Sequence, residues 1–364
     1  MKEAGVKIKT LIVFGAVLVG LVVVLWPFKA DYSADDRQFV RDVYDRPNLR
    51  DQFSIFKITT NEAPNAHYVP VLLVTFSSLF KIFNGDPRAF FIFNLVIHYL
   101  NGVLFYLIFL RITKRSSLVG LASLIFLFHP SNLSTVSWIS AGLTHGLTMF
   151  FSLNALLGLQ LYREKRFKHY YAFSLTACLC AYLTKPLAYS LPLILFLFDW
   201  TLSTQLGEKS NFKKNLTRSL TQIAPYFILL MPFIVIAVIK YPFGNVARIW
   251  GGMTFGIHPL LRGLDLVSHI LIPLKVSPEL RFGLVAFVYF ACFFLLLVGL
   301  IQQRSLVLFS LGWLWSSIFL MLSSNFRPIT SLWRYHYYPM MGLLVILISV
   351  ADILLKMIRA REKV

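Results

Sequence analysis

Two adjacent carboxylates, Asp35 and Asp36, follow the first apolar run of the chain. A carboxylate at a membrane surface can act as a general base, and a second one beside it can orient the first or help bind a cation. The same pair can equally be a solvated acidic loop, or be matched by the nearby Arg37 and Arg41. Asp35 and Asp36 are therefore candidates for proton transfer, with the purely structural alternative still open.

Two cations in apolar surroundings form a second group of candidates. Lys185 precedes Pro186 within a long apolar region, and Arg334 lies in the aromatic run 333–339. An Arg guanidinium can bind phosphate through two parallel hydrogen bonds, whereas a Lys at the end of a span often only extends its ammonium to the interface. An interfacial belt of Tyr and Trp explains the aromatic residues of this run better than it explains Arg334. Both cations are candidates for binding an anion such as a phosphate.

Several polar residues inside apolar segments have a simpler interpretation. His129 and Pro130 end an apolar run, where Pro can simply stop a helix. Asn94, His98 and Asn101 recur at i, i+4 and i+7, so they share one face of a helix. In membrane bundles, polar side chains of this kind commonly connect neighbouring helices by hydrogen bonds. We expect these three to hold helices together rather than to bind a ligand.

The composition places all of these residues in a membrane protein. Of 364 residues, 57% are hydrophobic and only 14% are charged, whereas about a quarter of an ordinary globular domain is charged. The three Cys suggest neither a disulfide framework nor a metal site. The sequence also lacks the glycine-rich phosphate and dinucleotide motifs and the zinc-protease motif. No cofactor and no metal is therefore required by the sequence, and a need for a divalent metal stays undetermined.

Hydropathy predicts an all-α polytopic membrane protein that forms a single domain over residues 1–364. A spanning helix needs about 20 mostly apolar residues, and shorter ones occur inside a bundle. About ten segments (nine to eleven) qualify, and for the two short ones, 117–131 and 170–184, a partly re-entrant path stays open. A shorter apolar segment, 68–83, contains Lys81 and is expected to lie along the membrane interface. The predicted spans are 10–28, 89–110, 117–131, 135–161, 170–184, 186–202, 220–239, 283–302, 305–323 and 338–356.

The net charge of +19 is explained by topology. If both termini are cytoplasmic, 19 of the 35 Lys and Arg lie on the cytoplasmic side, mostly in short loops and tails, as the positive-inside rule requires. The charge then gives no support to a nucleic-acid partner. The opposite face receives two long extracytoplasmic segments, 29–88 with interfacial helices and 240–282. Because the cytoplasmic loops are short, we expect any chemistry on the extracytoplasmic face.

A colinear set of short motifs resembles a known family. The motifs are, in order, Asp35-Asp36, Tyr68-Val69-Pro70, the segment from Asn94 to Asn101, His129-Pro130, Val136-Ser137-Trp138-Ile139, Leu183-Thr184-Lys185, Asp199-Trp200, the segment from Leu271 to Ser277, and the segment from Arg334 to Pro339. Over about 31–343 this order resembles the membrane part of the transmembrane O-mannosyltransferases with tetratricopeptide repeats, and their bacterial relatives. The resemblance implies a C-type (GT-C) glycosyltransferase fold.

The resemblance also implies an activity. Such enzymes transfer a sugar from a polyprenyl-phosphate carrier to an extracytoplasmic protein or glycan acceptor, so the lipid-linked sugar and membrane lipids are the expected partners. By resemblance, Asp35 and Asp36 supply the base that takes the acceptor's hydroxyl proton. A phosphate leaving group develops negative charge, which cations stabilise. The residues expected to bind the carrier phosphate or line its cavity are Lys185, Arg334, Tyr335, His129, Tyr68 and His67.

Departures from the family leave a second hypothesis open. Charged residues of the family are replaced here by Val69, Ser134, Leu143 and Pro186. Either the substrate differs, or the chain has kept the fold and become a non-catalytic subunit or scaffold of a membrane complex. A transporter is disfavoured because the sequence shows no two corresponding halves. The leading hypothesis is the glycosyltransferase, and the compact chain favours a bacterial inner membrane.

Overall fold

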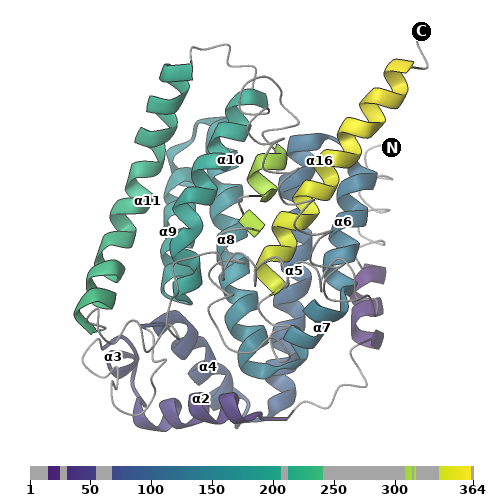
Figure 1. The fold of residues 1–364 in the computed structure, drawn as a ribbon. Coiled ribbons are helices and arrows are strands. Elements are labelled where there is room, and N and C mark those ends of the chain that lie inside the picture. The colour runs from purple at the N-terminus through teal and green to yellow at the C-terminus, as the bar shows by residue number, and fades with distance from the viewer. Residues whose placement is uncertain are drawn as a thin grey trace, which may run out of the picture.

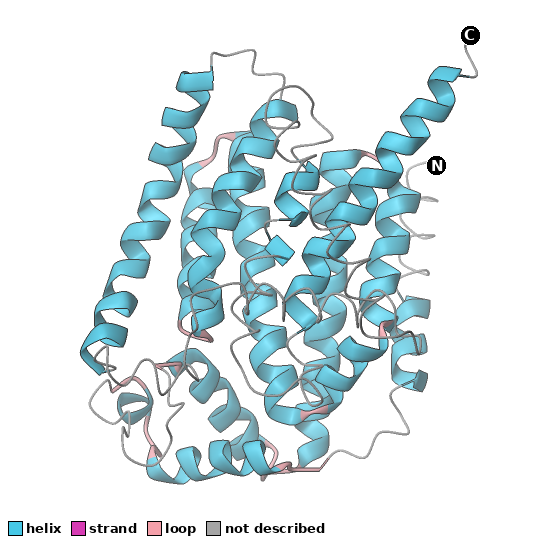
Figure 2. Ribbon diagram, viewed as in Figure 1, coloured by secondary structure: helices cyan, strands magenta, loops and turns pink. Residues whose placement is uncertain are grey.

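The part of the chain that the structure describes is all-helical. The computed structural model describes residues 15–24, 31–54, 68–205, 212–240, 308–313, 315–316 and 336–361. Within these ranges the helices are joined by short connections, and none of these residues forms a strand (Figure 2). The prediction of an all-α protein is confirmed for this part of the chain.

Two long helices, α5 (Pro87–Thr113) and α8 (Ile139–Lys165), form the centre of the bundle. The first of these helices starts sharply because Asp86 accepts a hydrogen bond from the Arg88 amide at 2.9 Å and Pro87 occupies the first helical position. Beside α8 lies α9 (Lys168–Tyr182). A Cβ added at Gly158 would lie 2.9 Å from the Ser174 Cβ, so glycine allows these two helices to approach closely.

Five described helices are long and apolar enough to cross a membrane. They correspond to five of the predicted spans, whereas α9, at 15 residues, has the same short length as the predicted span 170–184. Predicted spans 10–28, 283–302 and 305–323 lie wholly or partly outside the described residues, so the count of ten stays a prediction. The five helices are Pro87–Thr113, Ile139–Lys165, Pro186–Ser203, Leu216–Ile236 and Tyr337–Arg359.

A bend separates α6 (Ser116–Phe128) from α7 (Pro130–Ser137), and it corrects two predicted boundaries. The two helices meet at 48°, and together they could form a sixth span. The ring nitrogen of His129 accepts a hydrogen bond from the Ser131 amide at 3.3 Å and thereby caps α7. The new helix, α7, therefore begins at Pro130, and residues 135–137 belong to it. The predicted span 135–161 begins only at Ile139.

Three shorter helices lie across one end of the bundle (Figure 1). They are α2 (Ala34–Asp45), α3 (Leu49–Gln52) and α4 (Pro70–Ile82). The Phe39 ring of α2 stacks on the Phe76 ring of α4 at 5.4 Å, and Phe76 packs against Phe90 of α5 at 4.7 Å. The predicted extracytoplasmic segment 29–88 therefore contains short helices that pack on the bundle. Their position at the membrane interface stays a prediction.

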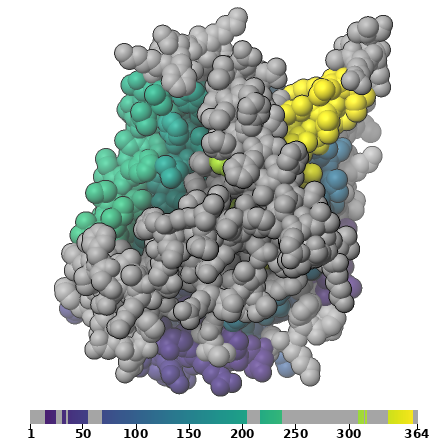
Figure 3. Space-filling model, viewed as in Figure 1, coloured from purple at the N-terminus to yellow at the C-terminus, as the bar shows by residue number. Residues whose placement is uncertain are grey.

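The outer helices expose apolar side chains of the kind that contacts lipid. Figure 3 shows α11 (Phe212–Lys240) and α16 (Tyr337–Arg361) on opposite sides of one face, with α2 at the lower end. Ile228 and Met231 of α11 are exposed, as are Leu354 and Met357 of α16. A water-soluble protein rarely exposes large apolar residues so extensively, which supports the membrane assignment.

The basic loop residues gather at the end opposite α2. The helices α5 and α8 both end there, at Thr113 and Lys165, and α16 runs towards the same end (Figure 1). Arg115, next to the end of α5, forms a 3.1 Å ion pair with Asp352 of α16. This arrangement agrees with the grouping of basic loops that the sequence predicts for the cytoplasmic side.

Candidate functional site

Asp36 joins α2 to the start of α8. The carboxylate is fully buried, and one of its oxygens accepts a hydrogen bond from the Ser33 amide at 2.7 Å. The other oxygen accepts a hydrogen bond from the Ser140 amide at 2.7 Å. Both oxygens therefore bind backbone groups, which suits a residue that fixes geometry better than a proton acceptor. Asp35 lies in the first turn of α2, and its side chain is outside what the structure describes.

Lys185 contacts a buried histidine that the sequence analysis left without a role. Lys185 directly precedes the short 3-10 helix η1 (Pro186–Ser190), which connects α9 to α10 (Leu191–Gln205). The lysine is half-buried, and its Nζ donates a hydrogen bond to Nε2 of His145 on α8 at 3.0 Å. An ammonium group can only donate, so Nε2 accepts and the imidazole is neutral with its proton on Nδ1.

Tyr68 belongs to the same neighbourhood as Lys185. The Val71 amide, in the first turn of α4, donates a hydrogen bond to the Leu183 carbonyl at the end of α9, at 3.1 Å. This contact brings together two chain segments, one just after Tyr68 and one just before Lys185. The Tyr68 hydroxyl donates to the Phe53 carbonyl at 3.1 Å, and burial raises the pKa of this tyrosine. His67 lies just outside the described residues.

A row of hydroxyl side chains on α8 runs from this end into the bundle. Thr144, Thr148 and Ser152 each donate a hydrogen bond to the carbonyl four residues earlier, at 2.6, 2.6 and 2.7 Å. With Ser140 they occupy one face of the helix, because residues four apart lie above one another. We call these four residues the hydroxyl row. Its inner end contacts α16, where the hydroxyls of Ser152 and Tyr338 lie 2.9 Å apart.

The start of α16 is tied to α5. The Tyr337 hydroxyl lies 2.8 Å from Nδ1 of His98 and 3.1 Å from Nδ2 of Asn101. Asn94 of the same face donates to the Ile139 carbonyl at 3.0 Å. The prediction that this polar face connects helices is confirmed. Arg334 and Tyr335 precede α16 directly in the chain and lie outside the described residues.

His129 has a local structural task. It is half-buried at the bend between α6 and α7, where Nδ1 lies 2.7 Å from the Ser131 hydroxyl and also accepts from the Ser131 amide. In the part of the chain that the structure describes, these capping contacts stay within one turn. The described contacts therefore connect Asp36, Lys185 and Tyr68 to one end of the bundle, and they do not connect His129 to those three.

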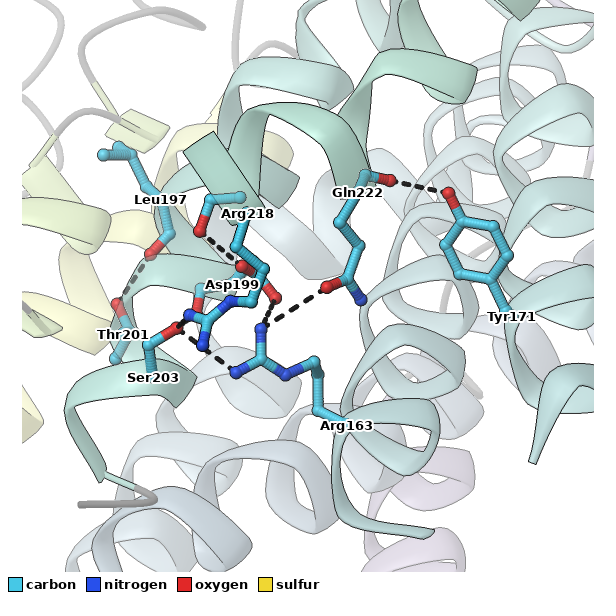
Figure 4. A network of polar contacts seen from close by, with 9 residues as sticks. Arg163, Tyr171, Leu197, Asp199, Thr201, Ser203, Arg218 and Gln222 are labelled. Carbon is cyan, nitrogen blue, oxygen red and sulfur yellow. Dashed lines mark hydrogen bonds and ion pairs between the residues drawn. The ribbon is translucent and has the colours of Figure 1, made fainter. Parts of the chain in front are cut away.

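A second polar cluster lies at the opposite end of α8, between α8, α10 and α11 (Figure 4). Arg163 and Asp199 are fully buried and form an ion pair of 2.6 Å. The other Asp199 oxygen accepts a hydrogen bond from the Ser219 hydroxyl at 2.6 Å, and both Arg163 and Arg218 donate to Ser203. The sequence motifs include Asp199 but not Arg163, and they name no partner for Asp199. An acid within an apolar span was the available signal for this pair.

Metal binding finds no support among the described residues, which contain no cluster of three or more His, Cys, Asp or Glu side chains. No protein-family model, no curated protein and no solved structure matches this chain. The geometry of the described part thus offers a half-buried cation and a hydroxyl row at the α2 end. A cation of this kind can bind a phosphate, whereas the hydroxyls of Thr144, Thr148 and Ser152 already donate to backbone carbonyls of α8.

Proposed function

We propose that the protein transfers a sugar from a polyprenyl-phosphate carrier to an acceptor hydroxyl at the α2 end of the bundle. The observation that supports this most is the Lys185 ammonium group, half-buried and bound to the neutral His145 ring. Because the ring is neutral, this contact orients the ammonium without cancelling its charge. An ionisable residue at such a position in a membrane protein is a functional-site hypothesis by default.

The proposed reaction is a single displacement at the sugar. The acceptor oxygen attacks the anomeric carbon while the bond from that carbon to the phosphate oxygen breaks, and the bonding electrons stay on the phosphate. Lys185, with Arg334 and Tyr335 by family resemblance, stabilises the charge that develops there. The acceptor's proton passes to Asp35 as the general base. Asp36 holds α2 on α8, so it keeps the adjacent carboxylate in position.

The proposed topology puts this site on the extracytoplasmic face of a bacterial inner membrane. The end opposite α2 carries the basic loops, and the positive-inside rule assigns such loops to the cytoplasm. Both termini are then cytoplasmic, and the proposed fold is the GT-C type with about ten spans. The isoprenoid tail of the carrier stays in the bilayer beside the bundle, which explains why the sequence carries no nucleotide motif.

The test is sugar transfer from a radiolabelled polyprenyl phosphohexose in membranes that contain the protein. Lys185→Met removes the cation, and we expect transfer to fall about a hundredfold because a charge-assisted contact to the leaving phosphate is lost. Asp35→Asn removes the base and should lower transfer at least as much. Lys168→Met, an exposed lysine at the opposite end, is the matched control and should leave transfer unchanged. Normal transfer in both Lys185→Met and Asp35→Asn would refute the proposed roles.

A second candidate function is a non-catalytic scaffold with the same fold. The observation that favours it is Asp36, whose two oxygens both bind backbone amides, together with the four replaced family charges. Purification in mild detergent separates the two functions. A stable complex of fixed stoichiometry without transfer supports the scaffold, and an isolated chain that transfers sugar excludes it.

A further inference from the structure

We propose that the final turns of α16, together with the turn between α5 and α6, bind the headgroup of an anionic phospholipid. This surface lies at the end of the bundle opposite α2 (Figure 1), so the inference is independent of the proposed sugar transfer. It also goes beyond the topology rule, which assigns cations to one side of a membrane without specifying where on that side a lipid is held.

The turn between α5 and α6 consists of two residues whose backbone is fixed. The Lys114 amide donates a hydrogen bond to the Leu110 carbonyl at 2.8 Å. The Arg115 amide donates to the Thr113 hydroxyl at 3.3 Å. Lys114 has a φ of 57°, in the left-handed region where glycine is the usual residue at the end of a helix. A lysine therefore occupies this position at a conformational cost, and its side chain is exposed.

An ion pair fixes this turn against α16. Nε of Arg115 lies 3.1 Å from one oxygen of Asp352, and Nζ of Lys356 lies 2.5 Å from the other. Arg359 follows Asp352 by seven residues and Lys356 follows it by four, so all three lie on one side of the helix. Cations from two segments 237 positions apart are thereby brought together. We call Lys114, Arg115, Lys356 and Arg359 the basic face.

The opposite side of the same part of α16 is apolar. Its exposed apolar side chains recur every three or four residues, which places them along one side of the helix, and we call them the apolar stripe. The final turns of α16 also extend away from the helices that surround its beginning (Figure 1). A helix with one apolar and one cationic side is suited to the boundary between acyl chains and headgroups. The stripe consists of Leu347, Val350, Leu354 and Ile358.

The charges of this surface favour an anionic headgroup. Lys114 and Arg359 are exposed on the basic face, and a single carboxylate, Asp352, is shared by two of its cations. Each cation near the surface strengthens attraction to anionic lipids about fivefold. A free anion would use the cations but leave the apolar stripe uncovered. A lipid with a net negative charge has both an anionic and an apolar part, so it fits this surface best.

The experiment measures binding of phosphatidylglycerol and of phosphatidylcholine to the purified full chain in detergent, by native mass spectrometry. We expect the wild type to bind phosphatidylglycerol more tightly, and this preference should diminish at high salt in a parallel fluorescence assay. Lys114→Gln combined with Arg359→Gln removes two exposed cations of the basic face. This double variant should bind phosphatidylglycerol about tenfold more weakly and phosphatidylcholine as the wild type does.

The matched control removes the same charge from the same end of the bundle. Lys165→Gln combined with Lys168→Gln replaces two exposed lysines beside the turn between α8 and α9, and it should bind phosphatidylglycerol like the wild type. An equal loss of affinity in this control would show that overall charge, rather than the basic face, attracts the lipid. That result would overturn the proposal, as would unchanged phosphatidylglycerol binding in the Lys114 and Arg359 double variant.

Two further measurements test the lipid itself as the occupant. Ile358→Gln interrupts the apolar stripe and should weaken binding of both lipids. Inorganic phosphate should not displace phosphatidylglycerol, and displacement by phosphate would show that the surface binds only a free anion. Should the double variant not fold, Lys114→Gln and Arg359→Gln are measured singly. Each should lower phosphatidylglycerol affinity about threefold, and two single variants with wild-type affinity would also refute the proposal.

Discussion

The two ends of α8 solve the problem of a buried cation in different ways. At one end Arg163 is fully buried and paired with the carboxylate of Asp199 at 2.6 Å. At the other end Lys185 is half-buried, and its described partner is the neutral ring of His145 at 3.0 Å. The carboxylate neutralises the guanidinium and links α8 to α10, whereas the imidazole contact by itself does not neutralise the lysine. The comparison teaches that the partner, more than the cation, indicates function.

The largest expected effect comes from breaking the Arg163–Asp199 pair. Asp199→Leu leaves a buried guanidinium without its carboxylate, which costs about 3–5 kcal/mol of unfolding free energy. Denaturant unfolding in detergent, followed by tryptophan fluorescence, measures this loss. The double variant with Arg163→Met should recover most of it, because two apolar residues can replace a buried pair. A single variant as stable as the wild type would contradict the structural role.

The next effect concerns activity rather than stability. Lys185→Met should reduce sugar transfer about a hundredfold, equivalent to about 2.7 kcal/mol, and should change the unfolding free energy by less than about 1 kcal/mol. Asp199→Leu should instead lower the unfolding free energy strongly and leave sugar transfer almost unchanged. Transfer is compared in membranes in which both variants are folded. If Lys185→Met destabilises the protein as much as Asp199→Leu does, the contrast between the two ends disappears.

A smaller effect is expected for the link between α2 and the bundle. Asp36→Ala removes the acceptor for the Ser33 and Ser140 amides. Loss of a capping carboxylate costs about 1–2 kcal/mol, and the loss should be local to the α2 end. Hydrogen exchange measured by mass spectrometry should show faster exchange in 33–45 and unchanged exchange in the segment 216–236. Uniform acceleration over the whole chain would show that Asp36 supports the entire fold.

The smallest effect sharpens the comparison at the Arg163 end. Arg111 and Glu164 form an ion pair of 2.8 Å, but both side chains are substantially exposed. Arg111→Ala should lower the unfolding free energy by less than about 1 kcal/mol, and the difference should vanish at high salt. A loss as large as that of Asp199→Leu would show that burial does not distinguish the two pairs.

The main helices could be predicted from the sequence because length and apolar composition determine which segments can cross a bilayer. The predicted end of span 117–131 and the predicted start of span 135–161 were wrong, since Pro130 begins a new helix, α7, between them. The segment predicted over 170–184 has the same 15-residue length as α9, which begins two residues earlier at Lys168.

The site was less accessible to sequence reasoning. The hydroxyl row was visible as Ser or Thr at every fourth residue from Ser140 to Ser152, a spacing that places them on one helical face. The contacts of Asp36 with Ser140 and of Lys185 with His145 join positions far apart in the chain. They depend on how α2 and η1 pack on α8, which no local pattern specifies. The ligand-binding roles expected for His67, Arg334 and Tyr335 remain predictions.

The hydrogen bond from the Val71 amide to the Leu183 carbonyl has a mechanical consequence. It connects the first turn of α4 to Leu183, which lies two residues before Lys185. A displacement of α4 is therefore transmitted to the backbone next to Lys185 by this bond, in addition to the packing of α4 on α5. An acceptor that displaced this layer would therefore displace Lys185 together with it.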